Sequence, residues 1–511
     1  MLSKLNTLCL KGIDGREVLA EVYIASGLPA YSVVGLPDAA VKEAKDRVVA
    51  AVRNSGFDFP AKRITVNLAP AEIKKTGTHF DLPIALGVIA ASGKPGKKPP
   101  ARFADTFFIG ELALDGTLRP VAGVLAMLLA LKGRGCTAVV PAGNSAEAAI
   151  SGVNCLAASS LKEVASWLAG EAELSACAAA PTARTASGAG NDFSEVKGQP
   201  FAKRALEIAA AGFHNVLLVG PPGSGKSMLA RRFGALLPPM TFDESLETTK
   251  LYSVSGLGTA GRLIGERPFR EPHHTISDAA LIGGGSSPRP GEVSLAHNGV
   301  LFLDEFPEFS RPAIEALREP LEAWKVTVSR VKESVAYPAR FLMVAAMNPC
   351  PCGYLGHPTR ECACTPLQVH KYRAKISGPI LDRIDLQVQL SAVKYADWEA
   401  LPGGESSLEI AGRVLKAIEI QRKRFKGAAK ANAFMAGADL RRHCALPEGA
   451  SAVLETAMNK LGFSARSLDK ILKVSRTIAD LDGAAGIKRE HIVEAVQYRM
   501  LDKSAALAAG L

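Results

Sequence analysis

The amino-acid sequence predicts an α/β protein in which a phosphate-loop domain follows a separate α+β domain and precedes a helical region. Three observations predict this arrangement. A phosphate-loop pattern follows the apolar run Val216–Val219. Apolar runs alternate with helical periods over residues 192–395, as expected of a parallel sheet with crossover helices. Residues 171–191 are rich in Ala, Ser, Thr and Gly and are typical of a flexible linker. The expected domains are therefore 1–170, 192–395 and 396–511.

Composition and charge narrow the class of protein. The chain has 511 residues, a formal net charge of +11 and an isoelectric point near 9.1, which favour a polyanionic partner, nucleic acid first and an anionic membrane second. The beginning of the sequence has no apolar core of signal-peptide length, and the most apolar run, 121–131, is too short to span a bilayer. Nine cysteines without an export signal argue against a disulfide framework. We therefore expect a cytoplasmic protein.

Residues 1–170 carry the signs of an α+β domain. The segments on either side of Asp14-Gly15 read as the two strands of a hairpin, because this dipeptide favours tight turns. Asp38 is placed to cap a helix whose apolar residues recur up to Val52. A strand-like segment and an apolar stretch, Leu82 to Ala91, follow.

The phosphate loop is the most specific motif in the chain. Its glycines let backbone N–H groups surround phosphates, and it opens a helical segment whose N-terminus favours negative charge. Lys226 is predicted to bridge the β- and γ-phosphates of ATP, and Ser227 to hold Mg²⁺. The alternative is a Gly/Pro turn with a surface lysine. The residues predicted to bind the nucleotide are Gly220, Pro221, Pro222, Gly223, Ser224, Gly225, Lys226 and Ser227.

A second motif supplies the acids of a nucleotide hydrolase. The apolar run that starts at Val300 ends in Asp304 and Glu305, the Walker B pattern. Asp304 is predicted to bind Mg²⁺, and Glu305 to polarise the water that attacks the γ-phosphate. Asn348 ends the next apolar run, where an amide can sense the γ-phosphate. The alternative is a buried strand followed by solvated acids.

Four cysteines form a metal-ligand pattern directly after Asn348. Four thiolates can close a tetrahedral zinc site, although the C-x-C spacing is tighter than usual. Iron–sulfur ligation and free thiols are the alternatives, and His357 is the nearest other ligand. The residues are Cys350, Cys352, Cys362 and Cys364.

Two passages near the N-terminus, LAPAEIKKTGTHFDLPIALGVIAASG and IGELALDGTLRPVAGVLAMLLALKGRG, resemble the core segments of the Lon protease domain. That fold also occurs in a ribosomal protein domain. The Lon family uses a Ser and Lys dyad, because a lysine must take the proton of the nucleophilic hydroxyl. The resemblance places His79 at the serine position and Leu125 at the lysine position. We therefore expect a Lon-like (ChlI-type) N-terminal domain without protease activity.

The passage from LFLDEFPEF to SGPILDRIDLQVQL is similar to the magnesium chelatase I subunits and MCM helicases among the AAA+ ATPases. With the Lon-like domain in front, the chain resembles the ComM/YifB family of magnesium-chelatase-like proteins. The resemblance implies a hexameric AAA+ ATPase with a helical lid. It also implies DNA helicase and branch migration activity, which promotes integration of single-stranded DNA by recombination in natural transformation, or competence.

The same resemblance assigns further residues. Arg383, in ILDRID, is implied to reach a neighbouring subunit's ATP. Arg466, in FSARSLDKIL, is implied to be the sensor 2 arginine, which touches the nucleotide from the lid. Leu251 to Asn298 resembles the helix-2 insert, and residues 324–340 resemble the pre-sensor 1 hairpin, which lines the pore of a ring. The basic residues near its expected turn are predicted to contact DNA phosphates. These are Lys325, Arg330 and Lys332.

The alternatives for these residues are ordinary surface roles: an arginine paired with a nearby aspartate, or a solvated basic turn. Three other functions also remain open. A chelatase-like motor subunit would use the same ATPase to remodel a protein partner. An ATP-dependent protease requires the missing dyad. A nucleotide-regulated scaffold would not need hydrolysis.

Overall fold

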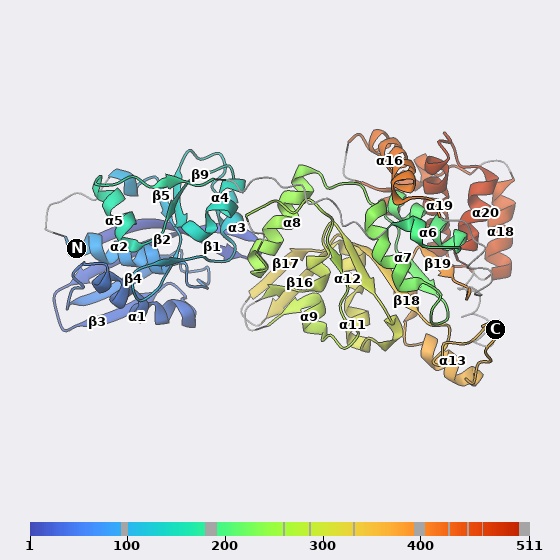
Figure 1. Cartoon of the computed structure of the whole chain (residues 1–511), viewed down its shortest axis with the longest axis horizontal. Coiled ribbons are helices and arrows are strands. Elements are labelled where there is room, and N and C mark those ends of the chain that lie inside the picture. Colours follow the sequence, from blue (N-terminus) through green and yellow to red (C-terminus); the bar gives the residue numbers. More distant parts are fainter. Residues whose placement is uncertain are drawn as a thin grey trace. The chain divides into compact units, whose positions relative to one another are not determined.

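A computed structural model of the protein describes residues 1–93, 101–178, 192–258, 261–285, 288–330, 333–392, 404–427, 430–446, 449–461 and 463–499 (Figure 1). The chain forms two compact units. Unit 1 contains Met1–Arg184 and Phe242–Ile264, and unit 2 contains Thr185–Thr241 and Gly265–Leu511. Among the described residues, no helix is both long and apolar enough to cross a membrane.

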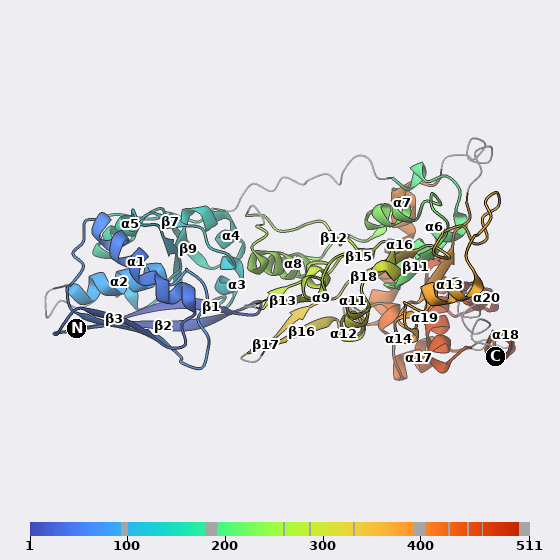
Figure 2. The ribbon, with the colours of Figure 1, turned by 90° about the horizontal axis from the view of Figure 1, so that it is seen from below.

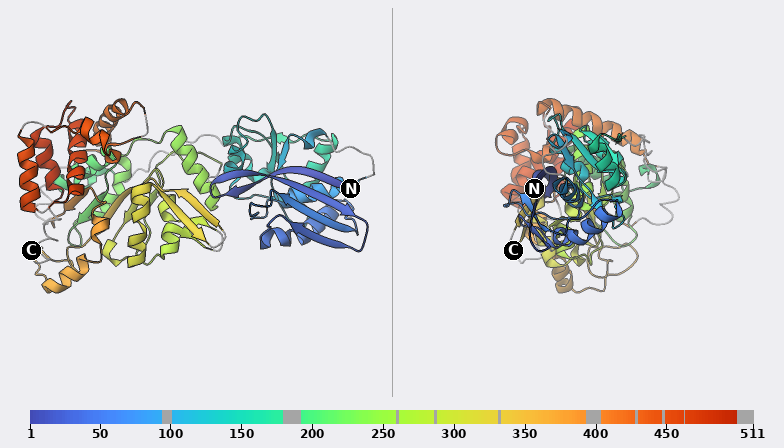
Figure 3. Two further views of the ribbon diagram at one scale, coloured as in Figure 1. Left: turned by 180° about the vertical axis from the view of Figure 1, so that it is seen from behind. Right: turned by 90° about the vertical axis from the view of Figure 1, so that its left-hand side faces the viewer.

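Unit 1 is built on a mixed eight-stranded sheet. Its strands lie in the order β10-β9-β8-β5-β1-β2-β4-β3, and the long antiparallel pair β1 and β2 is dark blue in Figure 3. The strands are β1 (Leu2–Lys11), β2 (Asp14–Ala25), β3 (Ala30–Val34), β4 (Arg63–Ala69), β5 (Thr106–Phe108), β8 (Thr137–Pro141), β9 (Asn154–Ala158) and β10 (Ser175–Ala176). A separate short pair is β6 (Glu111–Leu112) and β7 (Leu118–Arg119).

Helices pack on both faces of this sheet. α1 (Ala39–Asn54) and α2 (Asp81–Ser92) lie together and share one core with the sheet (Figure 2). α3 (Val124–Leu129) contributes to a second core with Leu8 of β1. The smaller helices are α4 (Ser145–Ile150) and α5 (Leu161–Ala169). The helices and strands expected of this domain are present, and its sheet contains both antiparallel and parallel pairs.

Two local predictions for unit 1 can be compared with the structure. Asp38 caps α1, since its side chain accepts a hydrogen bond from the Val41 N–H at 2.9 Å, as predicted. The turn of the hairpin was wrongly placed. Lys11 pairs with Asp14, so Gly12 and Ile13 form the turn, and Gly12 has a positive φ of 65° that suits glycine.

Helix α8 (Phe242–Ser255) belongs to unit 1, although the sequence analysis placed this segment with residues 192–395. It packs against α3. Lys250 forms an ion pair with Asp14 at 2.6 Å, and Ser253 donates a hydrogen bond to Glu147. The expected linker contains a strand, because Ser175–Ala176 form β10, which pairs with β9. Residues 179–191 of the expected linker lie outside the described ranges.

Unit 2 contains a five-stranded sheet in the order β12-β15-β18-β11-β19, in which every neighbouring pair is parallel. The predicted parallel sheet is therefore confirmed. Each of the three central strands is a continuous buried apolar run, which is typical of a sheet covered on both faces. The strands are β12 (Phe269–Arg270), β15 (Val300–Leu303), β18 (Leu342–Met347), β11 (Val216–Val219) and β19 (Leu386–Gln389).

Helix α6 precedes β11, the first strand of the sheet along the chain, and shorter helices and hairpins connect the strands. The helices are α6 (Pro200–Gly212), α7 (Lys226–Arg232), α9 (Asp278–Ile282), α10 (Glu292–Leu295), α11 (Arg311–Ala316), α12 (Arg318–Ala323), α13 (Pro366–Arg373) and α14 (Gly378–Leu381). The hairpins are β13 (Gly283–Gly284) with β14 (Arg289–Pro290), and β16 (Lys325–Arg330) with β17 (Glu333–Pro338).

The described part of the chain beyond residue 404 is helical, as its apolar periods predict. It contains α16 (Ser407–Arg424), α17 (Ala438–His443), α18 (Ala450–Leu461), α19 (Ala465–Leu481) and α20 (Arg489–Gln497). α16, α19 and α20 share one apolar core with α6 and the sheet. The interpretation of this region as a lid remains a prediction.

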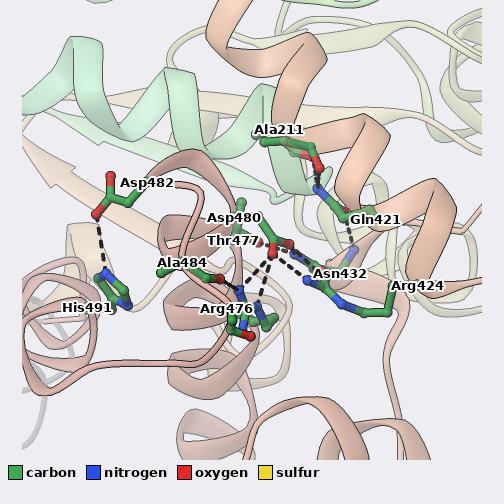
Figure 4. A network of polar contacts seen from close by, with 12 residues as sticks. Ala211, Gln421, Arg424, Asn432, Arg476, Thr477, Asp480, Asp482, Ala484 and His491 are labelled. Atoms are coloured by element: carbon green, nitrogen blue, oxygen red, sulfur yellow. Dashed lines mark hydrogen bonds and ion pairs between the residues drawn. The ribbon is translucent and has the colours of Figure 1, made fainter.

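A buried carboxylate joins the helices of this region (Figure 4). Asp480 is fully buried and accepts hydrogen bonds from the guanidinium groups of both Arg424 and Arg476. Gln421 of α16 donates to the carbonyl oxygen of Ala211 in α6 at 2.8 Å. Because a buried charge is costly without partners, the paired network fixes the helices in one arrangement against α6.

Candidate functional site: a phosphate loop at the carboxyl edge of the sheet

The phosphate loop follows β11 and leads into α7. Gly223 and Gly225 have φ values of 75° and 90°, a backbone conformation that glycine adopts without strain. Ser224 is buried, and its Oγ has no hydrogen-bond partner among the described residues. A buried hydroxyl inside a loop of N–H groups fits a nucleotide phosphate, which would accept its hydrogen bond.

Lys226 lies over the loop in a nearly buried position. Its Nζ donates to the carbonyl oxygens of Gly220 and Pro221 at 2.7 and 3.0 Å, and to Asn348 Oδ1 at 3.1 Å. Burial lowers the pKa of Lys226, and the negative charges of Asp304 and Glu305 oppose this shift. A cation held here, beside two acids, is placed to neutralise phosphate charge.

The two predicted Mg²⁺ ligands lie together. The Ser227 hydroxyl donates to Asp304 Oδ2 at 2.6 Å. β11 and β15 both neighbour β18 in a parallel sheet, so their carboxyl ends bring these residues to the same edge. A hydroxyl and a carboxylate at this separation fit Mg²⁺, which prefers oxygen ligands and often retains several waters.

Glu305 has a distinctive backbone and one side-chain partner outside the predicted set. Its φ is 51°, the left-handed region that non-glycine residues rarely adopt. Its N–H donates to Asp304 Oδ1 at 2.9 Å. Its Oε2 lies 3.0 Å from Nδ1 of His274. No motif in the sequence identifies His274, because two histidines that follow a proline have no spacing typical of a functional site.

The cysteine cluster has the geometry of a single-metal site. The Sγ atoms of Cys350, Cys352 and Cys362 are 3.4 to 3.6 Å apart, and the ligand atoms of all four cysteines lie within 4.8 Å of one another. Four sulfurs placed tetrahedrally around one zinc ion at about 2.3 Å are about 3.8 Å apart. A four-iron cluster binds each thiolate to a different iron and therefore holds the sulfurs farther apart.

Neighbouring groups also favour this interpretation. Backbone N–H groups of Leu355 and Cys352 donate to cluster sulfurs at 3.4 Å each, which stabilises thiolates. His357 Nδ1 accepts hydrogen bonds from the N–H groups of Thr359 and Arg360, so this alternative ligand is engaged elsewhere.

The cysteine loop packs on the phosphate loop. Gly353 has a φ of 84°, and a Cβ built on it would lie 2.8 Å from Pro222 Cδ and 3.8 Å from Asn348 Cγ. Only a residue without a side chain permits this approach. The cysteine loop therefore supports both the phosphate loop and the residue that contacts Lys226.

Arg383 and Arg466 lie at the opposite edge of the sheet. Arg383 precedes β19, whose Leu386 pairs with Val216, the first residue of β11, whereas the phosphate loop follows the last residue of β11. About 10 Å of strand separates the two edges. Arg466 NH1 lies 3.9 Å from Asp382, beside Arg383. Neither arginine is placed to reach the phosphate loop of its own chain.

Both arginines line a cavity of about 400 Å³. Arg383 pairs with Glu322, and its buried Nε has no hydrogen-bond partner among the described residues. Trp324 and Lys470 also line this cavity. The cavity thus brings cationic and acidic groups together at the edge of the sheet that faces away from the nucleotide loop, since Glu322, Asp382, Asp385 and Asp469 also line it.

The basic hairpin differs from the sequence prediction at one residue. Lys325 begins β16 and pairs with Pro338 at the base of the hairpin, about 17 Å of strand from its far end, so it does not lie near the turn. Arg330 is the last described residue of β16 and pairs with Glu333. Lys332 lies outside the described residues, as does the side chain of Arg330.

In unit 1, the two positions that the resemblance assigns to the dyad of the Lon family are both buried. Leu125 is fully buried, and His79 is 5% exposed. Burial lowers the pKa of His79 to about 4, and its Nε2 has no hydrogen-bond partner among the described residues. A neutral buried histidine and an aliphatic side chain at these two positions supply neither the hydroxyl nor the amine of such a dyad.

The parallel sheet, the phosphate loop and the acids at its carboxyl edge define an AAA+-like P-loop ATPase, a class that uses a nucleotide and Mg²⁺. Three family models match the chain: "Magnesium chelatase, subunit ChlI" at residues 192–398, "Subunit ChlI of Mg-chelatase" at 20–144, and "Magnesium chelatase, subunit ChlI C-terminal" at 404–499. The chain belongs to the ComM/YifB family of magnesium-chelatase-like proteins.

Two of the similar proteins match nearly the whole chain, and a third matches part of it. YifB of Escherichia coli K12 is 43% identical over 507 residues, which cover 98% of each chain. The competence protein ComM of Haemophilus influenzae is 43% identical over 496 residues, which cover 96% of each chain. The magnesium-chelatase 67 kDa subunit of Chlorobaculum parvum is 30% identical over 159 residues, 31% of this chain and 23% of that protein.

Proposed function

We propose that this protein is an ATP-driven DNA motor that assembles as a ring, with hexamers as the expected form, and migrates branches in recombining DNA. Its role would be to promote integration of single-stranded DNA, as in natural transformation. The observation that carries the proposal is the placement of the phosphate loop and Arg383 at opposite edges of one sheet.

This placement favours a ring because Arg383 and Arg466 both lie away from the phosphate loop of their own chain. In a head-to-tail ring, the edge that carries Arg383 and Arg466 would meet the nucleotide edge of the next subunit. An arginine supplied in this way stabilises charge on the transferred phosphoryl group. Lys226, Ser227, Asp304, Glu305 and Asn348 would supply the remaining groups, and hydrolysis would depend on subunit contact.

Charge and similarity favour DNA as the substrate. The net charge of +11 suits a polyanion. The H. influenzae relative carries the name of a competence protein. In a ring of this family, the β16–β17 hairpin would face the pore, with Arg330 and Lys332 toward DNA phosphates. Lys325, at the base of the hairpin, would contribute less.

DNA should stimulate the ATPase of the ring. We expect ATP turnover to rise severalfold with single-stranded or forked DNA, in a sample whose mass corresponds to six chains by mass photometry. Replacing Arg330 and Lys332 together by alanine should remove this stimulation. It should also lower the salt dependence of DNA binding by about two charges for each hairpin that contacts DNA, because each hairpin loses two phosphate contacts.

Lys416→Ala is the matched control, since Lys416 is exposed on α16, far along the chain from the hairpin. An ATPase that is indifferent to every DNA tested would contradict the DNA motor. It would favour the second candidate, a chelatase-like motor that remodels a protein partner, which the matches to magnesium chelatase subunits support.

We also propose that the four cysteines hold one structural Zn²⁺. The ion would supply no chemistry to hydrolysis. Its ligands would fix the loop that carries Gly353 against Pro222 and Asn348. The metal would thereby hold the phosphate loop in the shape that binds a nucleotide.

Purified protein should contain about one zinc per chain by elemental analysis. The double substitution Cys352→Ser and Cys364→Ser should release the metal and weaken binding of a fluorescent ATP analogue about tenfold or more, because outer supports of a site commonly contribute that much. Cys177→Ser is the control, since Cys177 lies in unit 1. Protein that contains no metal and in which the four cluster cysteines react as free thiols, or protein with bound iron, would disprove the assignment.

A further inference from the structure

In the described part of unit 2, a histidine contacts the carboxylate of Glu305, the glutamate of the Walker B pattern. His274 Nδ1 lies 3.0 Å from Oε2 of Glu305. The two atoms form an ion pair when the imidazole ring is protonated. The contact involves the acid proposed to polarise the attacking water.

The chain brings His274 to this place by the same rule that assembles the site. β12 pairs in parallel with β15, with Phe269 opposite Val300 and Arg270 opposite Leu301. The residues that follow β12 therefore emerge at the carboxyl edge where β15 delivers Asp304 and Glu305.

Two ion pairs fix the loop that carries His274. The guanidinium of Arg270 contacts both carboxylate oxygens of Glu292, at 2.6 and 2.7 Å. Glu271 receives two hydrogen bonds from Arg231, at 2.9 and 3.2 Å. Arg231 lies in α7, the helix that the phosphate loop opens. The loop is thus tied to the same helix that carries Lys226.

Aromatic contacts fix the ring itself. The His274 ring packs against that of His273, with centroids 4.2 Å apart, and meets the edge of Phe309 at 6.5 Å and 74°. A ring held on two sides directs its N–H in one direction. Glu305 is equally constrained at its backbone, where the left-handed conformation and the hydrogen bond to Asp304 set the direction of the side chain.

We propose that His274 is a positioning residue for Glu305: the contact between its Nδ1 and Oε2 holds the carboxylate in the orientation that polarises the attacking water. The inference rests on the proposed role of Glu305. The side chain of Glu305 is 55% exposed, and ion pairs between exposed groups contribute little to folding. The contact therefore acts on the direction of the carboxylate, and its loss leaves the folded state intact.

The effect should appear in kcat. His274→Ala should lower the kcat for ATP about ten- to a hundredfold, since a misplaced catalytic group costs about that much. The KM for ATP should stay within about twofold, because Glu305 orients water and does not bind the nucleotide. His274→Asn should recover most of the lost rate, since its amide N–H lies near the position of Nδ1.

A second pair of variants shows whether His274 acts through Glu305. In a Glu305→Ala background, His274→Ala should cause no further loss of single-turnover rate, because the partner is already absent. His370→Ala is the matched control, since His370 is exposed on α13. If Glu305→Ala itself leaves the rate unchanged, the proposed role of Glu305 fails.

Other outcomes would overturn the positioning role alone. These are a kcat that is unchanged or raised in His274→Ala, a loss confined to KM, no recovery in His274→Asn, or an equal loss in both backgrounds. A thermal midpoint that falls with the rate in His274→Ala but not in His370→Ala would assign His274 to the fold instead.

Discussion

Arg383→Ala is expected to lower ATP turnover by about a thousandfold, the scale of arginines that stabilise phosphoryl transfer. The folded state should change little, because Glu322, the partner of Arg383, is largely exposed and can be solvated. Binding of ATP should persist, since Lys226 and the phosphate loop lie at the other edge of the sheet. Steady-state turnover and titration of a fluorescent ATP analogue measure the two properties.

Mixing two inactive variants tests whether the arginine acts on a neighbour. Arg383→Ala retains a complete phosphate loop, and Lys226→Ala retains the arginine. A ring that contains both should regain activity where an intact loop meets an intact arginine. No recovery in verified mixed rings would show that Arg383 acts only within its own chain. Arg318→Ala, at an exposed ion pair with Glu315, is the control for loss of an arginine.

Glu305→Gln and Lys226→Ala should both abolish turnover, for different reasons. Glu305→Gln removes the base and should lower turnover about 10²- to 10⁴-fold while ATP remains bound. Lys226→Ala removes the cation that contacts Gly220, Pro221 and Asn348, and should also weaken binding of ATP. Single-turnover hydrolysis and nucleotide binding, measured on each variant, separate the two effects.

The opposite result for either variant would contradict the role proposed for that residue. If Glu305→Gln supports branch migration at the wild-type rate, hydrolysis is dispensable and the scaffold alternative gains over the motor. If Lys226→Ala binds ATP normally, the hydrogen bonds of Lys226 to the loop carbonyls serve the fold alone.

Much of unit 2 could be predicted from sequence because its signals are local. The phosphate loop has a fixed spacing, and buried apolar runs such as Val300–Leu303 mark parallel strands. The helix α19 lies in the region predicted to be helical, since Ser464 caps its start and its apolar residues recur at helical spacing.

The structure adds what depends on contacts between distant segments. The hairpin of unit 1 turns at Gly12 and Ile13, because β1 and β2 pair as far as Lys11 and Asp14, which places Asp14-Gly15 inside a strand. His274 meets Glu305 only through the pairing of β12 with β15. The separation of Arg466 from the phosphate loop of its own chain follows from packing beside Asp382, which no spacing encodes.

The membership of α8 in unit 1 has a practical consequence. The chain passes between the two units three times, so unit 1 is not a detachable N-terminal domain. Protease nicking between residues 179 and 191 should leave two fragments that co-elute, since α8 remains packed on α3 and paired with Asp14. A truncation that begins at residue 192 would expose the buried side of α8, including Leu251, to water. Expression of the ATPase alone would therefore call for replacement of the α8 segment by a short loop.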